Sequence, residues 1–379
     1  MDLKQNKVVN KKSLYTAKEL DAKWNETLLQ LARESPVEAD GLRIYFDRSP
    51  DLFAIPRLTS SGYCCGALFK NDTGLLGFAI TEEQRRWVSG KTERVLYYGN
   101  MHVSGKGRGQ AFFYRTSDLF FGHLPEGITY IYSYIMGTNK PAMSLVNRRH
   151  FRFPGVPFSS VIGQITMATI LLCIPVGPGK KYNIRPATLS DVPQIVDLLS
   201  KEFRQRFLAP VIDTETFMDN LRKRPDFGIT NYLIAECKGS IIGVCSVWDM
   251  SSLKRNTVVD YGRRMGLIRK AYNLVSPLLG VPRLPPAGEV LKVLTIAEYA
   301  VADRKPEILE ALLRHIYRSY RGKYHSIIFG SSKDDPLLKA TNPFFTIKID
   351  SNVILGAFDQ TEVKKNVGQP LIYADAILL

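Results

Sequence analysis

Residues 94–115 read Arg94-Val-Leu-Tyr-Tyr-Gly-Asn-Met-His-Val-Ser-Gly-Lys-Gly-Arg-Gly-Gln-Ala-Phe-Phe-Tyr-Arg115. The first ten residues are rich in β-branched and aromatic side chains, which predicts a strand ending near Val103. A glycine-rich loop with Lys106 and Arg108 follows, and we predict a helix over about 109–123. Glycines let the backbone approach a phosphate closely, and the free N–H groups of a helix start favour an anion. The stretch therefore predicts a phosphate-binding loop, with a flexible basic turn as the alternative.

Two pairs of similar segments divide the chain into two units. Hairpin signals occur at 63–80 and 232–247, and a strand-like run leads into a proline-containing helix start at 131–141 and at 327–336. Each unit mixes strands and helices, which predicts an α/β (α+β) fold. We place the boundary in the turn-rich segment 177–181, because glycine, proline and lysine follow an apolar run there.

The predicted domains are 1–178 and 179–379, the second with an insertion near 248–290. Inside this insertion, the basic segment 261–272 predicts a helix that either packs as a connection or touches a membrane surface. Just after the domain boundary, Thr188 followed by Asp191 resembles a capping box at a helix start. The apolar run 161–176 is short for a membrane span and is rich in β-branched residues, so we expect a buried strand.

The amino-acid composition indicates the cellular compartment of the protein and the kind of partner that it binds. A chain of 379 residues with 45% hydrophobic content can bury two cores. The polar N-terminus lacks an apolar signal segment, and the five cysteines show no CxxC spacing, so we expect a cytoplasmic protein without structural metal or a disulfide framework. The net charge is +15, and the segment 100–180 carries eight Lys and Arg against two Asp and Glu. This excess predicts an anionic partner, but no nucleic-acid-binding motif accompanies it.

The order of strand, Arg-containing loop, helix, strand and Asn-x-x-Ala helix resembles the acetyl-CoA core of the GNAT N-acetyltransferases. In that family, an Arg/Gln-x-x-Gly-x-Gly/Ala loop covers the CoA pyrophosphate. Counting from Val103 puts Arg108 on the first position, with Ala111 and Phe113 on the glycine positions. Shifting the frame back makes Gly107 and Gly109 the glycines. We prefer the first frame because it keeps the strand-to-loop spacing and the charge.

The helix start Asn139-Lys-Pro-Ala-Met-Ser-Leu-Val-Asn-Arg148 is similar to the family's second element, Asn-x-x-Ala-x-x-Leu-Tyr-x-Lys/Arg. The tyrosine that protonates the departing CoA thiolate in the family is Val146 in this chain. The resemblance implies two GNAT-type domains, each a mixed, mostly antiparallel sheet flanked by helices. Tandem units of this kind occur in mycothiol synthase-like and N-myristoyltransferase-like enzymes. In the second unit, the loop 299–306 lacks glycines and carries Asp303, so we expect it to bind pyrophosphate poorly.

The resemblance also implies candidate catalytic residues. A glutamate often serves as the base where this chain has Tyr97, which would orient a water molecule or simply pack. His102 titrates in the right range, but strict strand alternation would place it on the face opposite Tyr97. Tyr134 is a candidate acid on the next strand. N-myristoyltransferase-like enzymes use their terminal carboxylate as the base, which makes the carboxylate of Leu379 another candidate.

The predicted function is transfer of an acetyl or longer acyl group from acyl-CoA to a small-molecule or peptide amine. One alternative is a catalytically inactive tandem GNAT-fold module that binds or senses acyl-CoA, and another is an enzyme that takes its acyl group from acyl carrier protein. The residues expected to bind the cofactor are Met101, His102, Val103, Gly107, Arg108, Gly109, Gln110, Ala111, Asn139 and Ala142.

Overall fold

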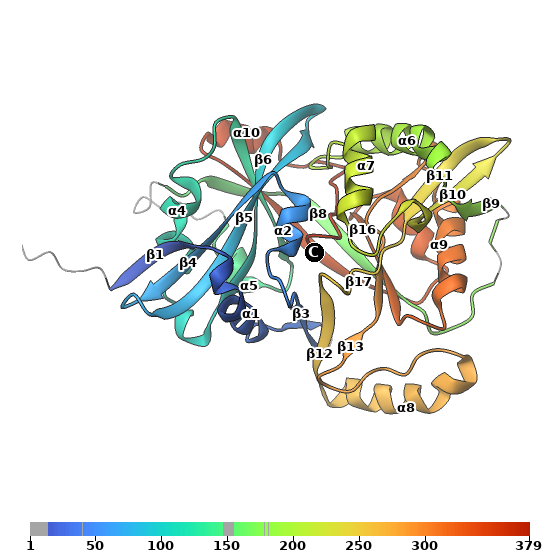
Figure 1. The fold of residues 1–379 in the computed structure, drawn as a ribbon, viewed down its shortest axis with the longest axis horizontal. Helices are drawn as coiled ribbons and strands as arrows, with labels where there is room; N and C mark the ends of the chain where they lie inside the picture. Colours follow the sequence, from blue (N-terminus) through green and yellow to red (C-terminus); the bar gives the residue numbers. More distant parts are fainter. Residues whose placement is uncertain (1–13, 40, 147–154, 178, 181) are drawn as a thin grey trace, which may run out of the picture.

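The computed structural model describes residues 14–39, 41–146, 155–177, 179–180 and 182–379. Three β-sheets with helices packed around them form the fold, and the described strand pairs are antiparallel except for two parallel contacts. Figure 1 shows the N-terminal segments, in blue and cyan, on one side and the yellow and orange segments on the other. The predicted mixed α/β fold class is confirmed.

The largest sheet contains nine strands of the described chain. They are β1 Tyr15–Leu20, β4 Gly62–Lys70, β5 Gly74–Val88, β6 Lys91–Val103, β7 Ile128–Met136, β8 Phe158–Leu171, β14 Val293–Thr295, β16 Ser326–Ser332 and β17 Thr346–Ala357. Their order across the sheet is β1-β4-β5-β6-β7-β17-β8-β16-β14. Strands from the beginning and the end of the chain are therefore neighbours in one sheet.

Two smaller sheets of four described strands each complete the architecture. One has the order β15 Tyr299–Val301, β11 Ser240–Ser246, β10 Tyr232–Cys237 and β9 Asn183–Pro186. The other has the order β13 Val290–Leu291, β12 Arg255–Tyr261, β3 Leu42–Asp47 and β2 Val37–Ala39. In this last sheet β12, from the segment that we predicted as an insertion, pairs with β3 from the first unit. The insertion thus joins the two sides of the molecule.

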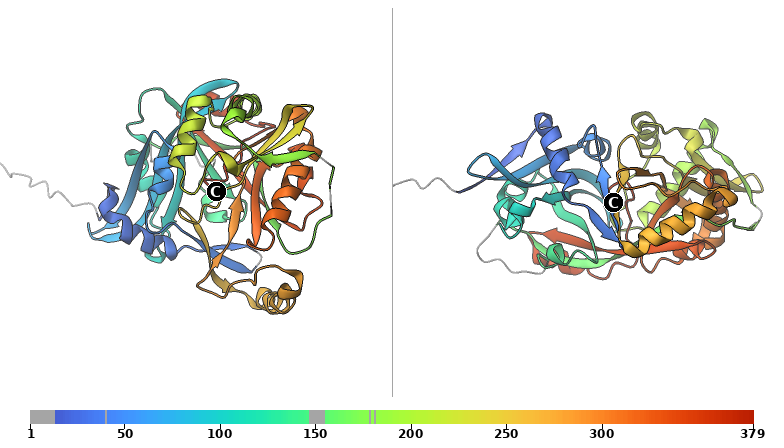
Figure 2. Two further views of the ribbon diagram at one scale, coloured as in Figure 1. Left: turned by 45° about the vertical axis from the view of Figure 1, so that its right-hand side comes forward. Right: turned by 90° about the horizontal axis from the view of Figure 1, so that it is seen from below.

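The helices flank these sheets. They are α1 Asn25–Arg33, α2 Ala54–Thr59, α3 Phe112–Arg115, α4 Ser117–Phe121, α5 Lys140–Met143, α6 Val192–Arg204, α7 Thr214–Lys223, α8 Arg263–Leu279, α9 Pro306–Tyr320 and α10 Gln360–Lys365. The helix α9 shows the sequence pattern behind this packing, since Leu309, Leu312, Leu313 and Ile316 recur at helical spacing and are all fully buried. By contrast, α8 lies at the lower edge of the molecule in Figure 1 and in the left-hand view of Figure 2.

The strand β17, from the end of the chain, lies between β7 and β8, which both come from the first unit. Its residue Val353 pairs with Tyr134 of β7 on one side and with Gly163 of β8 on the other. β8 pairs in turn with β16, where Ala168 lies opposite Phe329. The sheet therefore runs without interruption across the boundary at 178/179 that we predicted from the sequence, and the domain division stays a prediction.

The local signals in the sequence produced the expected elements. Both predicted hairpins are present, as β4–β5 and β10–β11. Each turns through two consecutive residues with positive φ, Asn71 and Asp72 in the first and Lys238 and Gly239 in the second, which suits the twist of a tight hairpin. The capping box at Thr188 is also confirmed.

The apolar run 161–176 forms most of β8, whose Ile165, Ala168 and Ile170 are fully buried. This confirms the predicted buried strand. Among the residues that the structure describes, no helix is long and apolar enough to cross a membrane.

Candidate functional site

The strands β6 and β7 begin side by side and then separate. Their parallel pairing runs from Arg94 opposite Ile128 to Tyr97 opposite Tyr132, and no further pair joins them within the described strands. Beyond this point β6 stays with β5, whereas β7 stays with β17. The separation leaves a wedge between the strands, and it holds a cavity of about 240 Å³, which we call the wedge cavity.

The wedge cavity has a largely aromatic and aliphatic wall. Its lining side chains are Tyr97, Tyr98, Asn100, Met101, Phe113, Phe121, Ile131, Tyr132, Ser133, Tyr134, Ile135, Met136, Asn139, Ala142, Leu145, Val146, Pro157, Ser159 and Ile354. Five of the predicted site residues are thus brought together here, namely Met101, Asn139, Ala142, Tyr97 and Tyr134. The other predicted residues, His102, Val103, Gly107, Arg108, Gly109, Gln110 and Ala111, are not part of this lining.

A β-bulge interrupts β6 beside the wedge cavity. Asn100 and Met101 lie together opposite Ala79 of β5, and Asn100 has a φ of 51°. The extra residue changes the alternation of side chains along the strand. His102 pairs with Phe78, and Tyr97 pairs with Glu82, four residues further along β5.

Because Phe78 and Glu82 share one face of β5, their partners His102 and Tyr97 also share a face. Met101 lies on the other face, where it accepts a hydrogen bond from the Tyr98 hydroxyl. The prediction that His102 faces away from Tyr97 is therefore wrong, because strict alternation does not hold through the bulge.

The loop after β6 is held in one conformation by Ser104. Its hydroxyl donates to the carbonyl oxygen of Leu76 at 3.0 Å and accepts from the N–H of Gly107 at 3.1 Å. A Cβ atom on Gly107 would lie 2.2 Å from that carbonyl oxygen, so this position requires glycine. Lys106 and Arg108 are exposed on the outside of this turn and present two positive charges to the solvent.

The predicted helix over 109–123 is wrong in its extent. Ala111 has a φ of 53°, so helical backbone begins only at Phe112. A second break follows at Thr116, whose hydroxyl bonds to the carbonyl oxygen of Phe112 at 2.9 Å and competes with the backbone ladder. Two short helices, α3 and α4, replace the single long one.

Asn139 caps the short helix α5. Its side-chain oxygen accepts from the N–H of Ala142 at 3.2 Å, which fixes the first turn at the edge of the wedge cavity. Ala142 is buried, and Val146 lines the same cavity where the resembled family has a tyrosine. Arg148, the last residue of the predicted motif, lies outside the described residues.

Tyr97, Tyr132 and Tyr134 form a cluster at the base of the wedge, with ring centroids between 5.1 and 6.0 Å apart. Burial raises the pKa of Tyr97, and the charge of Glu82 adds to this effect. Burial likewise raises the pKa of Tyr134, whose hydroxyl donates to the carbonyl oxygen of Tyr373 at 2.8 Å. Both phenols therefore stay protonated at neutral pH.

His102 lies against the ring of Phe78, with 5.1 Å between ring centroids. Burial lowers the pKa of His102 to about 4, and the nearby charge of Arg48 lowers it further. Its Nδ1 atom is buried and has no hydrogen-bond partner among the described residues. His102 lines a separate small cavity of about 40 Å³, so the structure does not place it against the wedge.

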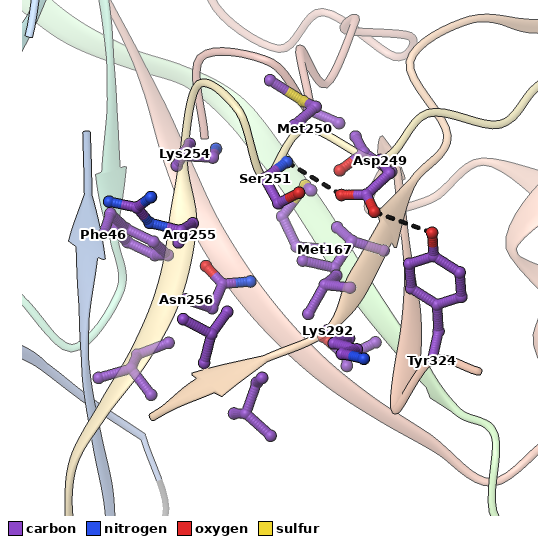
Figure 3. A pocket seen from close by; sticks show the side chains of 18 of the residues that line it. Phe46, Met167, Asp249, Met250, Ser251, Lys254, Arg255, Asn256, Lys292 and Tyr324 are labelled. Atoms are coloured by element: carbon purple, nitrogen blue, oxygen red, sulfur yellow. Dashed lines mark hydrogen bonds between the residues drawn. The ribbon is translucent and has the colours of Figure 1, made fainter. Parts of the chain in front are cut away.

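A larger cavity of about 830 Å³ lies between the nine-stranded sheet and the sheet that contains β12 and β3. Its walls come from β2, β3, β7, β8, β12, β13, β14, β16 and β17 and from the loop before β12, and Figure 3 shows side chains of 18 lining residues. Asp249 is fixed there by the N–H of Ser251 at 2.9 Å and by the hydroxyl of Tyr324 at 2.8 Å. Asn256 also lines this large cavity, and its Oδ1 atom has no partner among the described residues.

Two features connect the large cavity to the predictions. Met136 lines both this cavity and the wedge cavity, so the two are neighbours at the end of β7. Leu379 also lines the large cavity, and Figure 1 marks the end of the chain in the middle of the molecule. The role of the Leu379 carboxylate as a base stays a prediction.

Lys254 is a half-buried cation in the wall of the large cavity. Its Nζ atom lies 5.5 Å from the centroid of the Phe46 ring and 3.5 Å from the carbonyl oxygen of Ile377. Burial lowers the pKa of Lys254 to about 7, the charge of Arg48 lowers it further, and the charge of Asp375 opposes the change. The neutral amine form of Lys254 is therefore more accessible near neutral pH than that of an exposed lysine.

A cluster of buried polar side chains adjoins Tyr97. Glu82 lies directly across from Tyr97 and is fully buried, and burial raises its pKa. Further along β5, Arg86 forms a buried ion pair with Asp375 at 2.8 Å and donates to Gln84 at 2.9 Å. Neither Oε1 of Glu82 nor Nη1 of Arg48 has a hydrogen-bond partner among the described residues.

The sequence analysis missed Lys254 and this cluster. A signal for the cluster was present in Thr81-Glu-Glu-Gln-Arg-Arg86, a polar run inside an otherwise apolar strand segment. Alternation along this run puts Glu82, Gln84 and Arg86 on one face, which the structure buries. Lys254 has no comparable signal, because the sequence around it reads as a surface loop.

The second unit contains a corresponding pair of strands that separate. β14 and β16 pair in parallel up to Thr295 opposite Ile328, after which β15 pairs with β11 instead. Here the hydroxyl of Tyr299 bridges the gap to the carbonyl oxygen of Gly330 at 3.0 Å. Arg206 reaches the same region through its bond to Ser331 at 3.2 Å.

The charge of Arg206 is balanced by Glu202 at 2.7 Å and Asp335 at 2.8 Å. Arg304, from the loop 299–306, contacts the same two carboxylates. A buried ionic network thus occupies this position in the second unit. That its loop binds pyrophosphate poorly stays a prediction.

Comparison with known proteins places this architecture. No protein-family model matches the chain, and no curated protein sequence matches it. Among solved structures, it is similar to a GCN5-related N-acetyltransferase from Sphaerobacter thermophilus, with a TM-score of 0.59 and 12% identity over 92% of this chain and 96% of that chain. It is also similar to N-myristoyltransferase from Saccharomyces cerevisiae with bound myristoyl-CoA, with a TM-score of 0.57 and 14% identity over 98% of this chain and 87% of that chain.

These likenesses show that the chain has the GNAT fold over most of its length. At such low identities they show the fold alone.

Proposed function

We propose that this protein is an acyl-CoA-dependent N-acyltransferase. The acyl donor would bind in the wedge cavity, and an amine acceptor would bind in the large cavity. The observation that carries this proposal is the shared wall at Met136, which makes the two cavities neighbours at the end of β7. A two-substrate transfer needs such an arrangement, because the reacting atoms must meet without leaving the protein.

The wedge supplies the three contacts that an acyl-CoA needs. Its apolar lining suits the acyl chain and the thioester end of the donor. Lys106 and Arg108 are exposed on the loop after β6 and would bind the pyrophosphate through charge. The bulge at Asn100 frees backbone N–H groups from the ladder, and these would polarise the thioester carbonyl.

The proposed chemistry uses one base and one acid. The acceptor nitrogen attacks the thioester carbon and forms a C–N bond, while the C–S bond breaks. Lys254, as a neutral amine, takes the proton that the nitrogen loses. Tyr97 gives its proton to the departing CoA thiolate, since it lines the wedge and burial keeps its phenol protonated at neutral pH. Both side chains then recover their protonation state from solvent.

The large cavity indicates the size of the acceptor. A volume of about 830 Å³ lies in the range of pockets for drug-sized ligands, so a small-molecule amine or the end of a peptide would fit. Asp249 and Asn256 offer acceptor oxygens in its wall, whereas β8 and β17 contribute the apolar Met167 and Ile349 beside the hydroxyls of Thr169 and Ser351. An amine with an apolar body matches this lining.

The first test is calorimetric titration of acetyl-CoA and longer acyl-CoAs into the wild type and the Arg108→Glu variant. We expect binding by the wild type and at least about tenfold weaker binding by the variant, because a charge that attracts the pyrophosphate becomes one that repels it. Lys91→Glu, an exposed charge reversal at the far end of β6, is the matched control and should leave binding unchanged.

Absence of binding by the wild type would remove the acyl-CoA proposal. Acyl-CoA binding without turnover of any amine would favour the inactive binding or sensing module instead. Turnover that requires acyl carrier protein would favour the third alternative, and salt-sensitive binding of that carrier would accompany it.

A further inference from the structure

The helix α8 is attached to the body of the protein by only one of its faces. Asn273 donates to the carbonyl oxygen of Leu284 at 3.0 Å and accepts from its N–H at 2.8 Å. Arg269 donates to the same carbonyl oxygen at 3.2 Å, and Ser276 is fully buried on this side. The residues 269, 273 and 276 are spaced at helical intervals, so they define the attached face.

The opposite face carries large apolar side chains that point into solvent. Leu267, Leu274 and Leu278 are 68%, 80% and 88% exposed, and their spacing of seven and four residues puts them on one stripe. Ile268 and Val275 widen this stripe, at 45% and 42% exposed. These five are a third of the fifteen exposed large hydrophobic side chains in the described part of the chain, although they lie within twelve residues.

The charges around this stripe all have one sign. Arg263, Arg264 and Lys270 are exposed on α8, and Arg283 is exposed on the loop beneath it. No aspartate or glutamate occurs between Asp260 and Glu289 in the sequence. Arg263 and Lys270 are seven residues apart and therefore lie along one margin of the leucine stripe.

We propose that α8 binds flat on the surface of a membrane that contains anionic phospholipid. The leucine stripe would enter the boundary between headgroups and acyl chains, while the basic side chains contact the phosphate groups. Charge complementarity selects this occupant, because the stripe is bordered by positive charge without any acidic residue to pair with a protein partner of mixed charge. The position of α8 on the outer edge, as Figures 1 and 2 show, leaves its free face clear of the rest of the chain.

Membrane binding by α8 would place the proposed activity at a lipid surface. The loop that α8 packs on contributes Pro282 to the wall of the large cavity. A helix that lies on the bilayer would therefore hold this cavity close to the lipid surface, so that a membrane-associated amine is a suitable acceptor. This last consequence rests on the proposed function, whereas membrane binding itself does not.

The test is sedimentation of the full chain with vesicles of phosphatidylcholine alone and of phosphatidylcholine mixed with phosphatidylserine. We expect binding to the mixed vesicles, weakened by salt, and little binding to phosphatidylcholine alone. The variant Leu274→Glu/Leu278→Glu should bind vesicles at least about tenfold more weakly, because two charged groups would replace the leucines that enter the bilayer. In the variant Arg263→Glu/Lys270→Glu, the affinity for the mixed vesicles should fall by about fivefold or more for each charge that is reversed.

The control is Leu189→Glu/Phe345→Glu, which alters two apolar side chains that are 63% and 61% exposed and lie outside α8. It should bind vesicles as the wild type does. Hydrogen exchange of the wild type gives a second readout that needs no variant, and vesicles should protect residues 263–279.

Equal binding by the Leu274→Glu/Leu278→Glu variant and the wild type would overturn the proposal, as would protection confined to other segments. A wild-type dimer in light scattering that this variant converts to a monomer would overturn it too, because a second copy would then cover the stripe.

Discussion

The Nζ atom of Lys254 lies 3.5 Å from the carbonyl oxygen of Ile377, in the wall of the large cavity. This contact holds the amine of a loop residue against the buried C-terminal segment. A carbonyl oxygen accepts a hydrogen bond from either the ammonium or the neutral amine, so it fixes the position of Lys254 without forcing it to stay charged. The position is therefore compatible with proton transfer.

The activity should rise with pH through about 7. Burial lowers the pKa of Lys254 to about 7, and only the neutral form, which is populated above that pH, accepts a proton. In Lys254→Met, kcat/KM should fall by about 10²- to 10⁴-fold and lose this rise. Lys323→Met changes an exposed lysine of the same cavity and should retain both. A flat wild-type profile between about pH 6 and 8 would argue against Lys254 as the base.

Tyr97→Phe should lower kcat by about a hundredfold or more, because the thiolate would lose its proton donor. Adding Val146→Tyr should restore part of the activity, since residue 146 lines the same wedge cavity. Tyr134→Phe is the control: it removes a bond to Tyr373 and should cost about 1 kcal/mol of unfolding free energy with little effect on kcat. Single-turnover kinetics separates these outcomes, and an unchanged rate in Tyr97→Phe would assign the acid elsewhere.

His102 should make the protein sensitive to acid. Its folded-state pKa of about 4 lies below the unfolded value of about 6.5, so the unfolded chain binds more protons as the pH falls between these values. The wild type should therefore lose about 2 to 3 kcal/mol of unfolding free energy between pH 7 and about pH 4.5 through this group. In urea unfolding, the His102→Phe variant should lose less free energy of unfolding over this pH range, by the same amount. The His123→Gln variant, changed at an exposed position, should behave as the wild type.

Gly107→Ala should disturb the loop after β6. The new Cβ atom would lie 2.2 Å from the carbonyl oxygen of Leu76, so the loop must shift, at a cost of about 1 to 3 kcal/mol in unfolding free energy. Acyl-CoA binding should weaken together with it. The same change at Gly105, whose Cβ would meet open space, should affect neither quantity. Thermal unfolding and calorimetry measure both, and equal behaviour of the two variants would contradict the tight approach at Gly107.

Arg206→Met should destabilise the protein by about 3 to 5 kcal/mol, because Glu202 and Asp335 would remain buried with less compensating charge. Arg222→Met removes an exposed pair with Asp219 and should change the unfolding free energy by less than about 1 kcal/mol. Denaturant unfolding of both variants tests this difference. Similar values for the two would mean that the buried network contributes no more than a surface pair.

Much of the local structure could be predicted from the sequence. The hairpins and the capping box depend on residues near in sequence, such as Asn71 with Asp72 and Thr188 with Asp191, so their signals are complete within a few positions. The bulge at Asn100 depends on how β6 pairs with β5, and the sequence around Asn100 does not specify that pairing. The helix after Ala111 was overestimated for a related reason, because its backbone conformation is set by the loop around it.

The candidate site was predicted only in part. The strand and the Asn139 helix start have short-range signals, and they supply the wedge residues that were identified. Lys254 acquires its properties from Phe46, Ile377 and Arg48, which are remote in sequence. Burial by such contacts cannot be derived from a segment on its own.

The strand β17 also determines when, during synthesis, the large sheet and the wedge cavity can form. Ile354 and Gly356 contribute to the wall of the wedge cavity, although most of that wall comes from residues before 160. A nascent chain that has left the ribosome only up to residue 300 still lacks this part of the wall. Its strands β7 and β8 then each have an edge that is unpaired until β17 is synthesised. The first unit would thus be the earliest part synthesised and among the last to mature, which extends the period in which two open sheet edges need protection from aggregation.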